Sequence, residues 1–266
     1  MPFKKFYLLS AFYVLGVGSS LGQSSFSIDL NELSVLVRET PMPKMDDSRL
    51  GKILDRYYKE GLGGAETWKK VESLRVSGTL TLETGEFELD AFQKKPNFIK
   101  MTIIGNQGVQ RNLTLGYDGE VAWRILPGSK NKPMPMDEQE ARRFIHSAHF
   151  GNYLLYPYAV GKKVEYIDTV PVEGSICHHI RVTLETDFQV DYFIDIRSYL
   201  EIMVKNTDLK SGFVNSVVYE NYTRDHGMPI AKRAKSWEDG EWVSSLELHE
   251  IKVNTGLMPW MFSMPE

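Results

Sequence analysis

The chain has 266 residues, of which 42% are hydrophobic and 25% are charged, and its formal net charge is −4 at pH 7. These values exclude a disordered chain, and the slight acidity argues against a nucleic-acid-binding protein. The length allows one large domain or two small ones, and the single cysteine, Cys177, excludes a disulfide framework.

Residues 1–22 have the features of a cleavable export signal. Lys4 and Lys5 precede an apolar run over residues 6–17, which is too short to span a bilayer, and small residues follow it. We expect cleavage near Gln23, with residues 23–45 as an N-terminal extension and linker; an uncleaved amphipathic anchor is the alternative. Because no cysteine lies beside the cleavage site to take a lipid, we expect the exported protein to be soluble.

A helix is predicted after this linker. Glycine-rich residues 61–64 should end it, and one of residues 46–48 can cap its start. Its apolar residues recur at i, i+3, i+4 and i+7, namely Leu50, Ile53, Leu54 and Tyr57.

Strands are predicted from Leu74 onward, where the apolar period changes to two. Turn residues recur at 84–85, 96–97 and 118–119, which is typical of antiparallel hairpins. The alternating apolar residues of the first strand are Leu74, Val76, Leu80 and Leu82.

A polar loop over residues 127–135 and a second helix interrupt the strands. Asp137 can cap this helix, which should extend to about His149. Its apolar face is formed by Phe144, Ile145 and Ala148. An aromatic and aliphatic segment, residues 150–158, follows, and a second series of hairpins covers about residues 164–253.

These patterns predict an α+β chain that is mainly antiparallel β, with about ten or more strands. So many strands in one sheet must curl or close. A helix across the concave side of a curled sheet would enclose an apolar cavity, whereas a plain packed core is the alternative. Such a cavity suits a lipid, because burying an acyl chain contributes about 0.8 kcal/mol per CH₂.

The sequence contains none of the common catalytic or cofactor-binding motifs, so we expect neither enzymatic activity nor a cofactor. His146 and His149 lie one helical turn apart, but no further ligand at metal spacing accompanies them. His178 and His179 are adjacent on a predicted strand and should point to opposite faces. Methionines within residues 256–265 suit apolar packing better than a copper site.

Several segments together resemble periplasmic carriers of the LolA-like, outer membrane lipoprotein-sorting family. Residues 94–101 (KKPNFIKM) resemble that family's junction of two basic residues, Pro, Asn and an aromatic residue between early strands. Residues 117–128 (YDGEVAWRILPG) resemble its Asp-Gly hairpin, tryptophan strand and Pro turn. The resemblance covers about residues 50–266. It implies one LolA-like domain over residues 46–266, with a strongly curved, unclosed half-barrel sheet and helices that cover the concave face.

The resemblance also implies a function. LolA-like proteins are periplasmic carriers that hold the acyl chains of lipoproteins and move them toward the outer membrane, so we expect a monomer that binds lipidated proteins or other lipids. Its partners would be an inner-membrane export complex and an outer-membrane acceptor. An envelope sensor or regulatory module on the same fold, which binds lipid or a membrane-protein partner, is the alternative.

Lys95 takes the position of the basic residue that matters for cargo transfer in these carriers, although lysine lacks the planar fork of their arginine. The candidate ligand-binding or lid residues are Lys95, Phe98, Ile99, Met101, Ile103, Trp123, Phe144, Phe150, Leu154 and Leu155.

The parity of the strand before Pro96 makes a separate prediction for Lys95. Leu89 and Ala91 share one face, and continuation through Gln93 brings Lys95 to that apolar side. Pro96, which has no amide proton, should end the ladder there. Lys95 could then extend toward solvent or meet a polar lipid group; the alternative is an exposed lysine that only discourages edge pairing.

Overall fold

The structure is a computed structural model that describes residues 44–64, 67, 70–105, 112–154 and 162–266. The expected export signal, most of the expected linker and the candidate residue Leu155 lie outside the described residues.

In the described residues, a helical segment precedes the strands, and one α-helix separates the strands into two series. In chain order the elements are α2 (Arg49–Arg56), η2 (Tyr57–Gly61), β1 (Ser73–Leu82), β2 (Gly85–Lys94), β3 (Phe98–Ile104), β4 (Leu113–Tyr117), β5 (Ala122–Ile125), β6 (Pro133–Pro135), α4 (Glu138–Ser147), β7 (Lys163–Val172), β8 (Ser175–Leu184), β9 (Phe188–Asp195), β10 (Glu201–Asp208), β11 (Val214–Asp225), β12 (Met228–Glu238), β13 (Glu241–Val253) and η4 (Pro259–Phe262).

The strands form one 13-stranded sheet in the order β6-β5-β4-β3-β2-β1-β13-β12-β11-β10-β9-β8-β7. Its edges are β6 and β7, so the sheet is unclosed. The expected fold class, mainly antiparallel with about ten or more strands in an unclosed sheet, is confirmed. The chain divides into two compact units. Among the described residues, the first unit comprises residues 72–150 and 243–266, and the second comprises residues 44–71 and 151–242.

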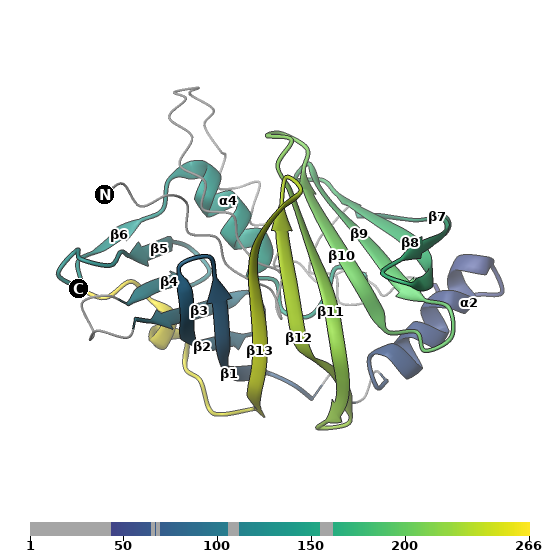
Figure 1. Ribbon diagram of the computed structural model, residues 1–266, viewed down its shortest axis with the longest axis horizontal. Helices are drawn as coiled ribbons and strands as arrows, with labels where there is room; N and C mark the ends of the chain where they lie inside the picture. The colour runs from purple at the N-terminus through teal and green to yellow at the C-terminus, as the bar shows by residue number, and fades with distance from the viewer. Residues whose placement is uncertain (1–43, 65–66, 68–69, 106–111, 155–161) are drawn as a thin grey trace. The chain divides into compact units, whose positions relative to one another are not determined.

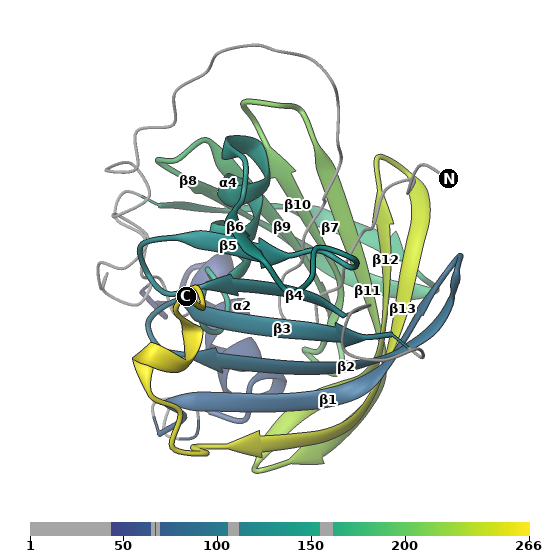
Figure 2. The same cartoon turned by 90° about the vertical axis from the view of Figure 1, so that its left-hand side faces the viewer.

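The first unit holds β1 to β6 and most of β13, and Figure 2 shows β1 to β5 side by side. One face of this sheet is apolar, because cross-strand pairing places Ala91 beside Met101, and both are buried. Gln93 lies on the same face and donates from Nε2 to the carbonyls of Ala148 (3.2 Å) and His149 (2.9 Å). The end of α4 is therefore fixed to this apolar face.

The α4 helix forms where the sequence predicts it. Asp137 is its N-cap, and the Asp137 carboxylate accepts a 2.9 Å hydrogen bond from the Glu140 backbone N–H. Glu140 in turn pairs with Arg124 of β5. The buried side chains Phe144 and Ile145 form its apolar side, as expected.

The opposite face of the first unit is covered by η4. Trp123 donates from Nε1 to the carbonyl of Phe262 (2.8 Å), and the rings of Phe98 and Phe262 lie 5.5 Å apart. Gly116 permits this packing, because a Cβ at that position would lie 2.3 Å from the Trp123 ring. The C-terminal segment thus closes the second side of these strands.

The second unit holds β7 to β12, which lie side by side in Figure 1, with α2 and η2 packed on one face. Ser48 caps α2 through its side chain, and Leu54 and Tyr57 have no exposed surface. Gly61 lets η2 pack against the backbone of Tyr199, since a Cβ at residue 61 would lie 2.1 Å from the Tyr199 carbonyl oxygen. Cross-strand pairing assembles the buried apolar residues of this sheet face, which are Ile180, Tyr192, Ile194, Val204 and Val217.

The structure differs from the sequence prediction in the loop at residues 127–135. Pro133–Pro135 forms the short strand β6, which pairs with β5 at the sheet edge. Prolines are tolerated there because an edge strand need not donate every amide. In the described part of the chain, no helix is both long and apolar enough to cross a membrane.

Candidate functional site

Lys95 lies directly after β2, in the hairpin that joins β2 to β3. Its side chain is 15% exposed, with Nζ 3.2 Å from Oε1 of Glu72 and 5.8 Å from the centroid of the Phe150 ring. Phe150 follows α4, and its backbone N–H donates to the carbonyl of Pro96. Lys95 therefore lies on the side that α4 covers, as the parity predicts, and β2 ends just before it.

The sequence-predicted ligand residues fall into separate groups. Five of them are buried in the first unit on the α4 side: Ile99, Met101, Ile103, Phe144 and Phe150. Phe98 and Trp123 do not join them, because alternate residues of a strand point to opposite faces, and both pack beneath η4. Leu154 is buried in the second unit.

A buried polar cluster fastens the helical cover of the second unit. The Tyr57 hydroxyl of η2 donates to Oε1 of Glu201 at the start of β10. Asn152 donates from Nδ2 to the Tyr57 hydroxyl (2.7 Å) and to Glu201 Oε1 (3.3 Å). The Glu201 backbone carbonyl accepts from the Tyr222 hydroxyl (2.7 Å). We call Tyr57, Asn152 and Glu201 the latch.

The pKa values of the two titratable latch side chains, Tyr57 and Glu201, are shifted. Burial raises the pKa of the Glu201 carboxyl, although its hydrogen bonds with Tyr57 and Asn152 act in the opposite direction. Burial, together with the neighbouring Glu201 carboxyl, raises the pKa of Tyr57 well above its ordinary value. The Tyr57 hydroxyl therefore stays protonated and remains a donor at neutral pH.

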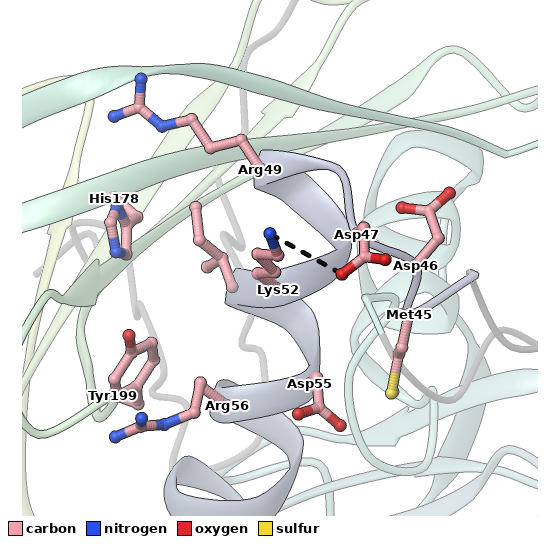
Figure 3. Close-up of a pocket in the computed structure, with 10 residues that line it drawn as sticks. Met45, Asp46, Asp47, Arg49, Lys52, Asp55, Arg56, His178 and Tyr199 are labelled. Carbon is pink, nitrogen blue, oxygen red and sulfur yellow. Dashed lines mark ion pairs between the residues drawn. The ribbon is translucent and has the colours of Figure 1, made fainter.

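A pocket of about 670 Å³ lies beside α2 in the second unit (Figure 3). Figure 3 shows Arg49, Arg56, His178 and Tyr199 on one side of the helix, with the aspartates on the other. The residues that line the pocket are Met45, Asp46, Asp47, Arg49, Lys52, Ile53, Asp55, Arg56, His178 and Tyr199.

Aromatic rings lie against the two arginine side chains of this pocket. The Arg49 guanidinium stacks 4.1 Å from the centroid of the Tyr166 ring, and that of Arg56 lies 5.1 Å from the centroid of Tyr199. Burial lowers the pKa of His178, and the nearby Arg49 lowers it further, against an opposing effect of Asp195. His178 is therefore uncharged at neutral pH.

The expected opposite orientation of the adjacent histidines is confirmed. His178 lies near the Tyr166 and Tyr199 rings on the α2 side, whereas Nε2 of His179 lies 2.7 Å from Asp191 Oδ1 on the other face. Within the described residues, no group of three or more His, Cys, Asp or Glu side chains could hold a metal ion.

The latch and the α2 pocket were missed by sequence reasoning. Tyr57 and Glu201 are 144 residues apart, and only the pairing of distant elements brings them together. A signal did exist for the pocket, because Arg49, Lys52 and Arg56 have the i, i+3, i+7 spacing of one helix side.

Comparisons with known proteins identify the fold of the chain. No protein-family model matches the chain, and no curated protein sequence matches it. A LolA superfamily protein from Nitrosomonas europaea is 13% identical with a TM-score of 0.52, and the match covers 80% of this chain and 96% of that chain. An outer membrane lipoprotein-sorting protein domain from Vibrio parahaemolyticus is 12% identical with a TM-score of 0.51, over 79% of this chain and 94% of that chain.

A third solved structure, of a DUF1329 family protein from Desulfovibrio piger, is 9% identical with a TM-score of 0.55, over 80% of this chain and 96% of that chain. At these identities the likeness concerns the fold and not the activity. The chain therefore has the fold of LolA superfamily and outer membrane lipoprotein-sorting proteins.

Proposed function

We propose that this protein is a periplasmic carrier that binds lipidated proteins or other lipids by their acyl chains and moves them toward the outer membrane. The observation that supports this most is that, in each unit, a short helical segment covers an apolar sheet face. The fold shared with an outer membrane lipoprotein-sorting protein domain supports it too. In this proposal residues 1–22 act as the export signal, and carriage needs neither a cofactor nor covalent chemistry.

The helical cover of the second unit can be exchanged for an acyl chain. Burial of Ile53, Leu54 and Tyr57 contributes roughly 2 kcal/mol per side chain, or about 6 kcal/mol together. A helical segment as short as residues 49–61 has little stability of its own in water. A long acyl chain contributes on the order of 10 kcal/mol when it is buried. The acyl chain can therefore replace the contacts that the helical cover makes with the sheet. The latch sets the remaining free-energy cost of opening the cover.

Lys95 has a place in this proposal at the end of the apolar face of the first unit. Its ammonium group lies 5.8 Å from the centroid of the Phe150 ring and 3.2 Å from the largely exposed carboxylate of Glu72. An ammonium group at the boundary between apolar and polar surface can meet the polar end of a bound lipid or lipoprotein. We propose that Lys95 acts in cargo transfer in this way.

Loading and transfer assays test the proposal. The mature protein is loaded with a triacylated lipoprotein or a fluorescent fatty acid, and its transfer to acceptor vesicles is followed. Saturable uptake is expected, and Lys95→Leu should change the transfer rate severalfold. Its effect on the free energy of unfolding should stay at about 1 kcal/mol, because the Glu72 partner is largely exposed and leucine keeps an apolar stem beside Phe150. Lys94→Leu is the matched control, since Lys94 is adjacent and of opposite parity.

Failure of well-folded protein to take up any acyl ligand would refute the carrier. An unchanged transfer rate for Lys95→Leu would mean that Lys95 pairs with Glu72 but has no part in transfer. Isolation of one stable membrane-protein partner, with no lipid bound, would favour the regulatory module on the same fold.

A further inference from the structure

The α2 pocket has the guanidinium groups of Arg49 and Arg56 on one side of the helix and an apolar neighbour, and this combination suits the head of a lipid. Ile53 lines the pocket and is buried, and Leu54 beside it faces the sheet. The pocket thus adjoins the apolar contacts of the helical cover. A lipid whose chain replaced those contacts could place its polar head in the pocket.

Arg49 has hydrogen-bonding capacity to spare. Among the described residues, its hydrogen-bond acceptors are neutral hydroxyls: those of Tyr166 (2.5 Å) and Thr169 (3.1 Å), both reached by Nη2. The guanidinium fork has further N–H donors, which match the oxygens of a phosphate. Stacking on Tyr166 holds the guanidinium in place, so less freedom is lost when an anion binds.

The carboxylates that line the pocket are already engaged. Asp46 accepts from the backbone N–H of Ser48 (3.0 Å), Asp47 lies 3.7 Å from Lys52, and Asp55 lies 2.7 Å from Lys59. They lie on the other side of α2 from Arg49 in Figure 3. Asp47 and Asp55 therefore pair with Lys52 and Lys59, while the Arg49 side chain lies on the side of His178.

His178 supplies a second observation that points to a ligand. Its Nδ1 atom is buried and has no hydrogen-bond partner within the part of the chain that the structure describes. The ring lies between Tyr166 and Tyr199, at centroid distances of 6.1 Å and 6.2 Å. A buried polar atom without a partner is costly, and an oxygen atom of a ligand beside Arg49 would satisfy it.

We propose that this pocket binds a phosphate group at Arg49 and His178, carried by the headgroup of a lipid whose acyl chains lie under α2. The inference rests on the proposed carrier function for the source of the phosphate. Arg56 lies seven residues from Arg49, which is about 10 Å along a helix, so one phosphate contacts the Arg49 end and not both. At the other end of the pocket Arg56 already pairs with Glu60 (2.6 Å), and that end is left for the rest of the headgroup.

Two lipids with identical chains test the proposal: a phosphatidate and the corresponding diacylglycerol, each titrated into the full chain. The phosphatidate should bind about tenfold more tightly, the effect of one charge-assisted hydrogen-bonded contact. Arg49→Gln should bring the two affinities together, while Arg49→Lys should retain part of the preference. Lys163→Gln, which removes an exposed cation of the same unit outside the pocket, should retain all of it.

Inorganic phosphate, followed through the ring resonances of His178, separates the possible sources. Phosphate that shifts these resonances in the wild type but not in Arg49→Gln supports the site. If it does so while both lipids bind equally, the site takes free phosphate and the headgroup proposal is overturned. The headgroup proposal is also overturned if the two lipids bind equally and phosphate has no effect. It is overturned as well if an acidic peptide displaces phosphate more strongly than phosphatidate does. If neither lipid binds, the carrier function fails, and the phosphate titration alone decides the site.

Discussion

The latch makes the cover of the second unit testable through a single hydroxyl group. Tyr57→Phe removes the donor to Glu201 and the acceptor for Asn152 while it keeps the buried ring. A hydrogen bond to a carboxylate contributes about 2 kcal/mol, and a neutral one contributes about 1 kcal/mol. Asn152 keeps its 3.3 Å contact with Glu201 in the variant. We therefore expect the opening of the cover to become easier by about 2 kcal/mol.

Hydrogen exchange measures this opening directly. Amides of α2 and η2 should exchange about 30-fold faster in Tyr57→Phe, which is 2 kcal/mol expressed as an equilibrium constant. Tyr222→Phe is the matched control, because it removes a hydroxyl that donates only to the Glu201 backbone carbonyl. It should leave exchange in α2 nearly unchanged. Equal exchange rates in Tyr57→Phe and the wild type, or equal effects of the two variants, would refute the latch.

The same cluster predicts a pH dependence. Since burial raises the pKa of Glu201 in the folded state above its ordinary value of 4.5, the folded protein binds the proton more tightly than the unfolded chain. The free energy of unfolding should therefore fall as the pH rises from 4.5 through the raised pKa. Glu201→Gln should remove this part of the slope, as measured by urea unfolding at several pH values. An identical slope in the variant would contradict the assignment.

Two further substitutions test the packing of the first unit. Gly116→Ala should lower the unfolding midpoint by the equivalent of about 2 kcal/mol, because its Cβ would lie 2.3 Å from the Trp123 ring; an unchanged midpoint in thermal unfolding would show that the ring moves freely. Gln93→Leu removes the hydrogen bonds to the carbonyls of Ala148 and His149 and should cost about 2 kcal/mol in urea unfolding, whereas a cost near zero would mean that solvent replaces them.

Local periodicity explains why the fold could be predicted from the sequence. Ser48 caps α2 and Asp137 caps α4, as side-chain oxygens before an apolar helical pattern predict. The turn at Pro96 also follows from chemistry, because proline cannot continue the ladder of β2. Each of these features depends on neighbours in the chain and needs no knowledge of distant contacts.

The candidate sites depend on contacts that periodicity does not specify. Alternation shows that Phe98 and Ile99 face opposite ways, but not that α4 covers one face and η4 the other. Nor does it identify which polar residue will meet Tyr57 and Asn152, so Glu201 resembles any carboxylate at the start of a strand. Gly116 acquires its role only because Trp123 lies against it across the strand pair.

The central claim is that this protein carries acyl chains. Mass spectrometry of the lipids and lipoproteins that co-purify with the protein under native conditions tests it most directly. The carrier predicts a stoichiometric acylated ligand, which is absent from the same protein after delipidation and returns on reloading. A folded protein that is recovered without any acylated molecule, and that takes none up when it is offered, would contradict the claim.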